Sequence, residues 1–82
     1  MLKVSVISPE AVLFEGETDS VVAPAFDGEV GILTDHAPLM ALLGTGQLRL
    51  GAGGGKRFNV SGGFMQVLNN QVRVVTEKAT AA

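Results

Sequence analysis

Apolar and polar residues alternate along much of this chain, and the alternation predicts short β-strands. The clearest cases are the segments Leu2–Ile7, Gln47–Leu50 and Lys56–Val60. Successive side chains of a strand point to opposite faces, so each segment has one face for a core and one for solvent. The residues that this pattern turns toward the core are Leu2, Val4, Val6, Leu48, Leu50, Phe58 and Val60.

Turn-forming residues separate the other apolar segments and set the predicted ends of further strands. We expect one strand to end at Glu15-Gly16-Glu17 and the next at Pro24, because proline lacks the N–H that a ladder needs. Asn69-Asn70 is predicted to form a tight hairpin turn, since Asn tolerates left-handed conformations. The further strands predicted in this way are Ala11–Phe14, Thr18–Ala23, Leu39–Leu43, Phe64–Leu68 and Val72–Thr76. The segment Leu39–Leu43 is short for a helix, so we interpret it as a buried strand.

The pattern therefore gives eight to ten short strands, with turn signals every seven to ten residues and no helix of ordinary length. It predicts an all-β fold, a flattened antiparallel β-sandwich or barrel of about ten short strands. Residues 1–82 are predicted to form one domain. Residues 77–82 have a helix-compatible composition but are too few to fold alone, so we expect them to be a tail.

The segment Gly28–Leu39 combines glycines, acids, a proline and the only histidine of the chain. Glycines suit bends that need positive φ, and Pro38 favours extended geometry at the residue before it. We therefore expect a shaped loop in place of a plain strand. Such loops on a rigid scaffold often carry partner contacts, and this one is predicted to present Glu29, Asp35 and His36.

Composition limits the classes of function that fit. The 82 residues are 46% hydrophobic and 17% charged, with a net charge of −2 and no basic cluster, so the charge pattern does not favour nucleic acid or an anionic membrane surface as a partner. There is no cysteine, and no apolar run approaches the ~20 residues that span a bilayer. The low charge indicates either a surface that a partner covers or eleven glycines that displace charged residues.

No catalytic motif is present in the sequence. The glycine-rich run at Gly51–Gly55, followed by Lys56, fails the phosphate-loop pattern, which requires glycine at position 50 and a hydroxyl residue at position 57. We interpret it as a flexible hairpin loop. His36 lacks companions with metal-ligand spacing, and Ser61 lies in no nucleophile motif. The sequence therefore predicts a non-enzyme without metal or cofactor. Gly62 and Gly63 suit a bulge, a kink that closes the sheet, or a close approach of another backbone.

Three blocks occur in a fixed order along the chain: S-P-E-A-V-L-F-E-G-E at residues 8–17, G-E-V-G-I-L-T-D-H-A-P-L at residues 28–39, and V-S-G-G-F-M-Q-V with N-N-Q-V-R-V-V at residues 60–75. In order and spacing they resemble the ε subunit of F-type ATP synthases. The resemblance covers nearly the whole chain and implies a flattened β-sandwich of about ten strands. It also implies a non-catalytic place in the rotating central stalk, on the cytoplasmic face of the bacterial plasma membrane or its organelle equivalent. There the domain would bind the γ subunit and the ring of c subunits, without a small-molecule substrate.

The resemblance implies roles for particular residues. The glutamate of G-E-x-G-I, here Glu29, would face the c-ring, and the histidine of H-A-P-L, here His36, would lie near γ. The residues predicted to bind these partners are Glu29, Gly31, Asp35, His36 and Pro38. The chain departs from many relatives at Thr34-Asp35, where Pro-Gly is frequent, and at Gln66, where glutamate is common. Family members usually continue into a C-terminal helical hairpin that can inhibit hydrolysis, and this sequence ends where the hairpin would begin.

One alternative of a different class remains from the sequence. The chain could be a free-standing β-sandwich that binds a small ligand at its edge or at the Gly51–Gly55 loop. The absence of Tyr and Trp counts against it, because these residues commonly line sugar and base sites.

Overall fold

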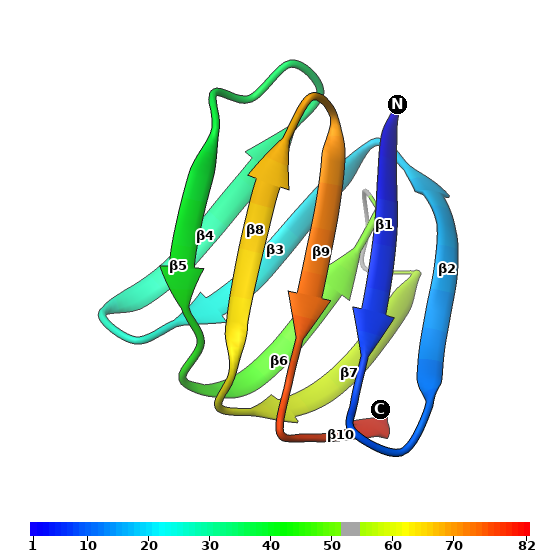
Figure 1. Ribbon diagram of the computed structural model, residues 1–82, viewed down its shortest axis with the longest axis vertical. Coiled ribbons are helices and arrows are strands. Elements are labelled where there is room, and N and C mark those ends of the chain that lie inside the picture. Colours follow the sequence, from blue (N-terminus) through cyan, green and yellow to red (C-terminus); the bar gives the residue numbers. More distant parts are fainter. Residues whose placement is uncertain (52–54) are drawn as a thin grey trace.

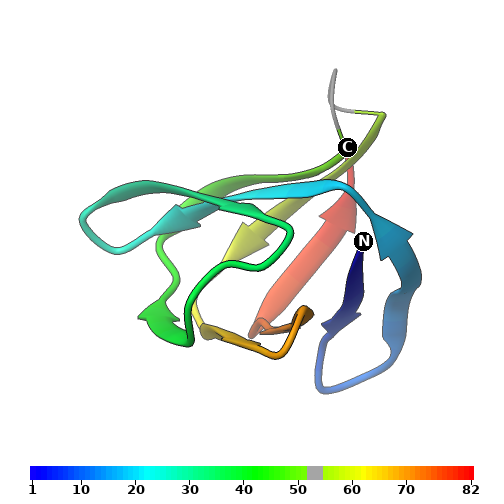
Figure 2. The same cartoon turned by 90° about the horizontal axis from the view of Figure 1, so that it is seen from above.

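The structure is a computed structural model that describes residues 1–51 and 55–82. These residues form two five-stranded sheets that pack face to face, with no helix in the part of the chain described (Figures 1 and 2). The predicted all-β sandwich of about ten strands is therefore confirmed. The ten strands are β1 (Leu2–Ile7), β2 (Val12–Thr18), β3 (Ser20–Ala25), β4 (Gly28–Leu33), β5 (Leu39–Leu42), β6 (Thr45–Leu50), β7 (Lys56–Ser61), β8 (Phe64–Leu68), β9 (Gln71–Val75) and β10 (Lys78–Ala81).

Sheet A has the strand order β2-β1-β9-β8-β5, and sheet B has the order β10-β7-β6-β3-β4. Neighbouring strands are antiparallel with one exception, because β1 and β9 run parallel. The expectation of a purely antiparallel fold was thus wrong at this pair. A direct hairpin forces its two strands to be antiparallel, whereas β1 and β9 are far apart in sequence and no turn fixes their relative direction.

The inward positions of both sheets form one apolar core. The alternation seen in the sequence is confirmed, since Leu2, Val4 and Val6 of β1 and Leu48 of β6 are almost completely buried. Across the sandwich, the rings of Phe14 and Phe58 lie with their centroids 6.4 Å apart at a tilt of 59°, which joins sheet A to sheet B. Aromatic pairs at this separation stabilise a core beyond the area that they bury.

Strands β2 and β3 are longer than the sequence indicated. Strand β2 continues through Glu15-Gly16-Glu17, because both glutamates face solvent. The ring of Phe14 covers the backbone of Gly16, and a Cβ atom at Gly16 would lie 3.2 Å from that ring. Strand β3 continues through Pro24 to Ala25. The Pro24 carbonyl oxygen accepts a hydrogen bond of 2.8 Å from the Gly44 N–H, so the strand stays anchored although proline donates nothing.

The loop expected over Gly28–Leu39 is largely absent. Its first half is strand β4, which pairs with β3 from Gly28 to Leu33 at the edge of sheet B. Val30 and Ile32 turn inward, while Glu29, Gly31 and Leu33 are exposed. An edge strand with one solvated face tolerates glycine and glutamate on that face, and for this reason the mixed composition did not exclude a strand.

Three smaller expectations also needed correction. The segment at Leu39–Leu42 is a strand as predicted, but it lies at the edge of sheet A with Met40 and Leu42 exposed, and is not buried. The strand predicted at Val72–Thr76 is observed at Gln71–Val75, one residue earlier. The tail expected at residues 77–82 instead contains β10, which pairs with β7 because a free sheet edge offers it a backbone partner. Of the predicted Gly51–Gly55 loop, residues 52–54 lie outside the described residues.

Two of the connections that carry the chain between the sheets, β7–β8 and β9–β10, lie next to each other. The β7–β8 connection contains Gly62 and Gly63 with φ of 71° and 102°. A Cβ atom at Gly63 would overlap the carbonyl oxygen of Val75, so the glycine is required for close backbone approach. Thr76, in the β9–β10 connection, is 1% exposed, and its hydroxyl lies 3.0 Å from the Gly62 carbonyl oxygen and 2.9 Å from that of Lys78. Backbone packing and one buried hydroxyl thus join the two crossovers.

Candidate functional site

The residues predicted to form one partner-binding loop occupy two separate places in the structure. Glu29 lies at the start of β4, beside the β3–β4 turn, whereas Asp35 and His36 follow the end of the same strand. A strand rises about 3.3 Å per residue, so roughly 20 Å separates the two positions. Figure 1 shows the β3–β4 turn and the β4–β5 connection at opposite ends of the hairpin. The expectation of a single loop presenting all three side chains was therefore wrong.

At the first position Glu29 forms an ion pair with Arg49 of β6. The Arg49 Nη2 atom donates to the Glu29 Oε2 atom at 2.7 Å, and the two side chains are 37% and 61% exposed for Arg49 and Glu29 respectively. The pair crosses β3, which lies between β4 and β6 in sheet B. It holds the Glu29 carboxylate at a defined point on the solvent face, with enough exposure to meet a second partner.

At the second position a hydrogen-bonded turn shapes the backbone. The Asp35 N–H donates to Asn70 Oδ1 at 2.6 Å, and Asn70 Nδ2 donates to Asp35 Oδ1 at 3.0 Å. The His36 N–H donates to the Leu33 carbonyl oxygen at 3.2 Å. His36 Nδ1 lies 2.7 Å from the Ala37 carbonyl oxygen, which can only accept, so this nitrogen carries the proton. The other ring nitrogen, Nε2, is the one that can meet a partner.

The two remaining predicted residues lie on exposed edges. Gly31 is exposed in β4, and a Cβ atom there would meet nothing within 4 Å. Pro38 precedes β5 and lines a shallow groove of about 290 Å³ together with Met40 and Leu68. Among the described residues, no hydrogen bond or ion pair links Gly31 or Pro38 to the Glu29 side chain.

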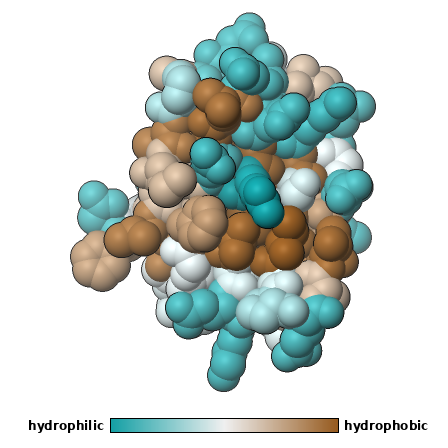
Figure 3. All heavy atoms as spheres, viewed as in Figure 1, coloured by the Kyte–Doolittle hydropathy of each residue, from teal (hydrophilic) through white to brown (hydrophobic). Residues whose placement is uncertain are grey.

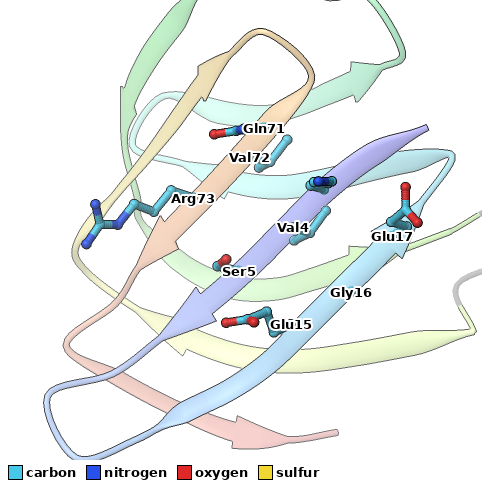
Figure 4. Close-up of a pocket in the computed structure, with 9 residues that line it drawn as sticks. Val4, Ser5, Glu15, Gly16, Glu17, Gln71, Val72 and Arg73 are labelled. Atoms are coloured by element: carbon cyan, nitrogen blue, oxygen red, sulfur yellow. The ribbon is translucent and has the colours of Figure 1, made fainter.

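A larger groove lies on the outer face of sheet A, over β1 and between β2 and β9 (Figure 4). Its volume is about 480 Å³. Two acids on β2, Glu15 and Glu17, line one side, and Gln71 and Arg73 on β9 line the other. The small side chain of Ser5, on β1, leaves space between these two sides of the groove. The acids on one side and Arg73 on the other suit a polar or zwitterionic contact.

A row of five apolar residues crosses the same face at one end of the strands, and we call it the apolar row. The register pairs Leu42 with Phe64, Phe64 with Val75, Val75 with Ile7, and Ile7 with Val12. Paired residues on adjacent strands lie on the same face, so each of the five strands contributes one apolar side chain to the row. Leu42 and Val12, at its two ends, are 67% and 57% exposed. Figure 3 shows a hydrophobic band across this face, with hydrophilic side chains above and below it.

The sequence did not reveal the apolar row. Its members come from five segments between residues 7 and 75, and each is a single outward position at one end of its strand. The consecutive Val74 and Val75 were an available signal, because one residue of such a pair in a strand must face outward. Only the strand register brings the five together.

Two other kinds of site are not found in the described residues. Across residues 1–51 and 55–82, no group of three or more His, Cys, Asp or Glu side chains is arranged to hold a metal ion. Nothing helical in that part of the chain has the length and apolar character that a bilayer crossing needs.

Comparisons with known proteins agree with this architecture. Residues 1–82 match the family model described as the ATP synthase Delta/Epsilon chain, beta-sandwich domain. The chain therefore belongs to the β-sandwich domains of ATP synthase delta and epsilon chains. More particularly, its curated relatives are epsilon chains. It is 49% identical over 77 residues to the ATP synthase epsilon chain of Leptospira borgpetersenii, and 48% identical over 82 residues to that of Desulforamulus reducens.

These alignments cover 93% and 98% of this chain, but 61% of each relative. The chain thus spans about three fifths of the length of the curated relatives that it matches. Two solved structures are similar in fold. A chain of the Euglena gracilis mitochondrial ATP synthase, described as OSCP/F1/c-ring, aligns over 98% of this chain and 52% of its own length with a TM-score of 0.87 and 23% identity. A chain of the Tetrahymena thermophila mitochondrial ATP synthase central stalk and c-ring aligns over 96% and 65%, with a TM-score of 0.78 and 17% identity.

Proposed function

We propose that this chain is a non-catalytic module of the central stalk of an F-type ATP synthase. It binds the γ subunit and the c-ring, and so helps to couple proton flow to ATP synthesis. Its family membership supports this proposal, as do fold relatives whose descriptions name the central stalk and the c-ring. The module would be peripheral to the membrane on the cytoplasmic face of the bacterial plasma membrane, held by its protein partners and not by the bilayer.

The observation that carries the proposal is the apolar row of sheet A. Strands lie about 4.8 Å apart, so five residues in register extend over roughly 19 Å. Contiguous apolar surface of this kind marks interaction sites, because its burial is favourable and its exposure is not. We assign it to γ. The adjacent groove, with Glu15, Glu17 and Arg73, then forms the polar rim that surrounds the apolar centre of a protein interface.

The contacts at the two ends of β4 follow from their separation. Glu29 is assigned to the polar loops of the c-ring, where its carboxylate accepts hydrogen bonds while Arg49 holds it in place. His36 and Pro38, at the other end of the strand, are assigned to γ, and Asp35 shapes their loop through Asn70. Gly31 lies between the two ends and leaves the edge of β4 open to close approach.

The test is the affinity of the purified chain for its cognate γ subunit, measured by biolayer interferometry. Val75→Asp places a charge in the centre of the apolar row, and Asn59→Asp places the same charge on the exposed face of sheet B. Loss of a central interface contact raises the Kd by about 30-fold or more, so we expect this for Val75→Asp and little change for Asn59→Asp. Val12→Asp, at a more exposed position, is a second variant that keeps the fold. Equal affinities for all four proteins would contradict the proposal.

A specific observation, the 480 Å³ groove, favours one alternative, a free-standing module that binds a small ligand. Calorimetric titration with nucleotides separates the two. The stalk proposal predicts no heat of binding, whereas saturable heat that is lost in Arg73→Gln would favour the alternative.

A further inference from the structure

Arg73 lies at the centre of the outer face of sheet A. Its strand, β9, is the middle one of the five, and Arg73 is the second of three outward positions on it, between Gln71 and Val75. The register places a neutral residue on each side of Arg73, namely Gln66 on β8 and Ser5 on β1. The polar rim of the face therefore reaches the centre at a positively charged side chain.

The Arg73 side chain is exposed, and nothing in the described structure neutralises its charge. Among residues 1–51 and 55–82, no hydrogen bond or ion pair involves its guanidinium group. The acid in the same register row is Glu15 on β2, two strands away and thus at a backbone separation of roughly 10 Å. Figure 4 shows Arg73 extended from β9 across β8, away from the acids of β2. The guanidinium group is therefore directed to the side of the face that carries no acid.

The surface on that side is mainly apolar. Met40 of β5 pairs with Gln66 of β8. Phe64 and Leu68 are the outward neighbours of Gln66 along β8. Met40 and Leu68 are 62% and 47% exposed, and the apolar row lies one outward position further along the same strands. A partner that buries these apolar side chains also removes water from the neighbourhood of the Arg73 charge.

A cation that loses its water in an interface needs a new partner. A buried charge without a partner is strongly unfavourable, whereas a charge-assisted hydrogen bond is stronger in such surroundings than in water. Arginine presents a planar fork of donors that matches a carboxylate, which accepts two parallel N–H bonds. Arginine is also one of the residue types that contribute most binding energy near the centre of protein interfaces. The position of Arg73 thus favours an acid on the partner.

We propose that Arg73 is a specificity-determining residue of the γ interface, where it binds the carboxylate of an aspartate or glutamate that γ presents within an apolar surface. This inference rests on the proposed function, because it takes γ as the partner that covers the apolar row. Glu15 and Glu17 repel an acid on the β2 side of the face, so the carboxylate is confined to the side of β8 and β5. The apolar row alone admits several placements of γ, whereas a central cation with acids on one side admits one.

The test is the kinetics of γ binding, measured by biolayer interferometry. Loss of one partner of a buried charge pair accelerates dissociation, so we expect Arg73→Gln to raise the Kd by about 30-fold, almost entirely through the dissociation rate. Arg73→Lys keeps the charge but not the planar fork, and we expect a rise of about 5- to 10-fold. Lys78→Gln makes the same change of net charge on sheet B and should alter neither rate constant. The thermal midpoint verifies that the variants fold.

Each outcome has a defined meaning. Unchanged affinity of Arg73→Gln overturns the inference, and so does tighter binding, which would mean that the bound cation has no partner. A change confined to the association rate overturns it as well, because it would indicate long-range attraction and not a buried pair.

The Val75→Asp variant separates failure of this inference from failure of the proposed function. If Val75→Asp abolishes γ binding and Arg73→Gln does not weaken it, only the role of Arg73 is wrong. If neither substitution weakens binding, the apolar row itself is not the γ interface.

Discussion

Asp35 and Asn70 exchange two hydrogen bonds between residues that lie 35 positions apart in the sequence. Both residues have positive φ, at 65° and 61°. The bonds join the β4–β5 connection, which follows a strand of sheet B, to the β8–β9 turn of sheet A. They therefore connect the two sheets at the end of the sandwich opposite the β3–β4 turn, and they set the position from which His36 and Pro38 reach a partner.

Removal of the Asn70 side chain tests the strength of this connection. Asn70→Gly keeps a residue that accepts positive φ, so the substitution isolates the hydrogen bonds from the backbone conformation. We expect a loss of about 1 kcal/mol in the free energy of unfolding, the usual net value of an intramolecular hydrogen bond. Urea denaturation measures it. Asn69→Gly, at the other positive-φ position of the same turn, is the control and should lose less than about 0.5 kcal/mol.

The sequence predicted the fold class because alternation is a local property. Each inward residue of Leu2–Ile7 or Lys56–Val60 is identified by its immediate neighbours, and the Asn69-Asn70 turn by its own conformational preference. The prediction from the sequence was wrong at the edge strands of sheet B. Strand β4 has glycine and glutamate on its solvent face, and residues 78–81 become a strand only because β7 offers an unpaired edge.

The candidate site was harder to predict because it depends on pairing between distant segments. The apolar row exists only where Ile7 meets Val75 in a parallel register, and no local pattern reports that register. For the same reason Glu29 and Asp35, six positions apart, were expected in one loop, although a strand separates them. The partner of Glu29 is Arg49, twenty residues away, on a strand that is not adjacent to its own.

Two glycines offer a matched pair of alanine substitutions. At Gly63 a Cβ atom would overlap the Val75 carbonyl oxygen, and φ is 102°. At Gly31 it would meet open space. We expect Gly63→Ala to lose more than about 3 kcal/mol, because both strain and overlap must be relieved by backbone movement. Gly31→Ala should be neutral or gain up to about 1 kcal/mol through reduced unfolded-state entropy. Chemical denaturation of both variants checks this, and equal stabilities would contradict the close approach at Gly63.

The buried hydroxyl of Thr76 gives a third stability prediction. Thr76→Val keeps the shape of the side chain but removes the group that donates to a carbonyl oxygen at the β7–β8 or β9–β10 crossover. A typical intramolecular hydrogen bond contributes about 0.5–1.5 kcal/mol net to stability. We expect a loss in that range by urea denaturation, whereas Thr80→Val, at an exposed position of β10, should change stability by less than about 0.5 kcal/mol.

Glu29 distinguishes a binding role from a structural one. Its ion pair with Arg49 is largely solvent-exposed, and exposed pairs contribute about 0–1 kcal/mol, so Glu29→Gln should leave the thermal stability nearly unchanged. If the carboxylate accepts hydrogen bonds from the c-ring, its neutralisation should raise the Kd for the isolated ring by about 10-fold, since charge-assisted bonds are roughly twice as strong as neutral ones. Glu10→Gln makes the same change of net charge in the exposed β1–β2 turn and serves as the control. A similar fall in affinity for both variants would indicate a general effect of charge. Unchanged affinity for both would leave Glu29 with no more than its bond to Arg49, and the c-ring contact would then have to be sought elsewhere on the sandwich.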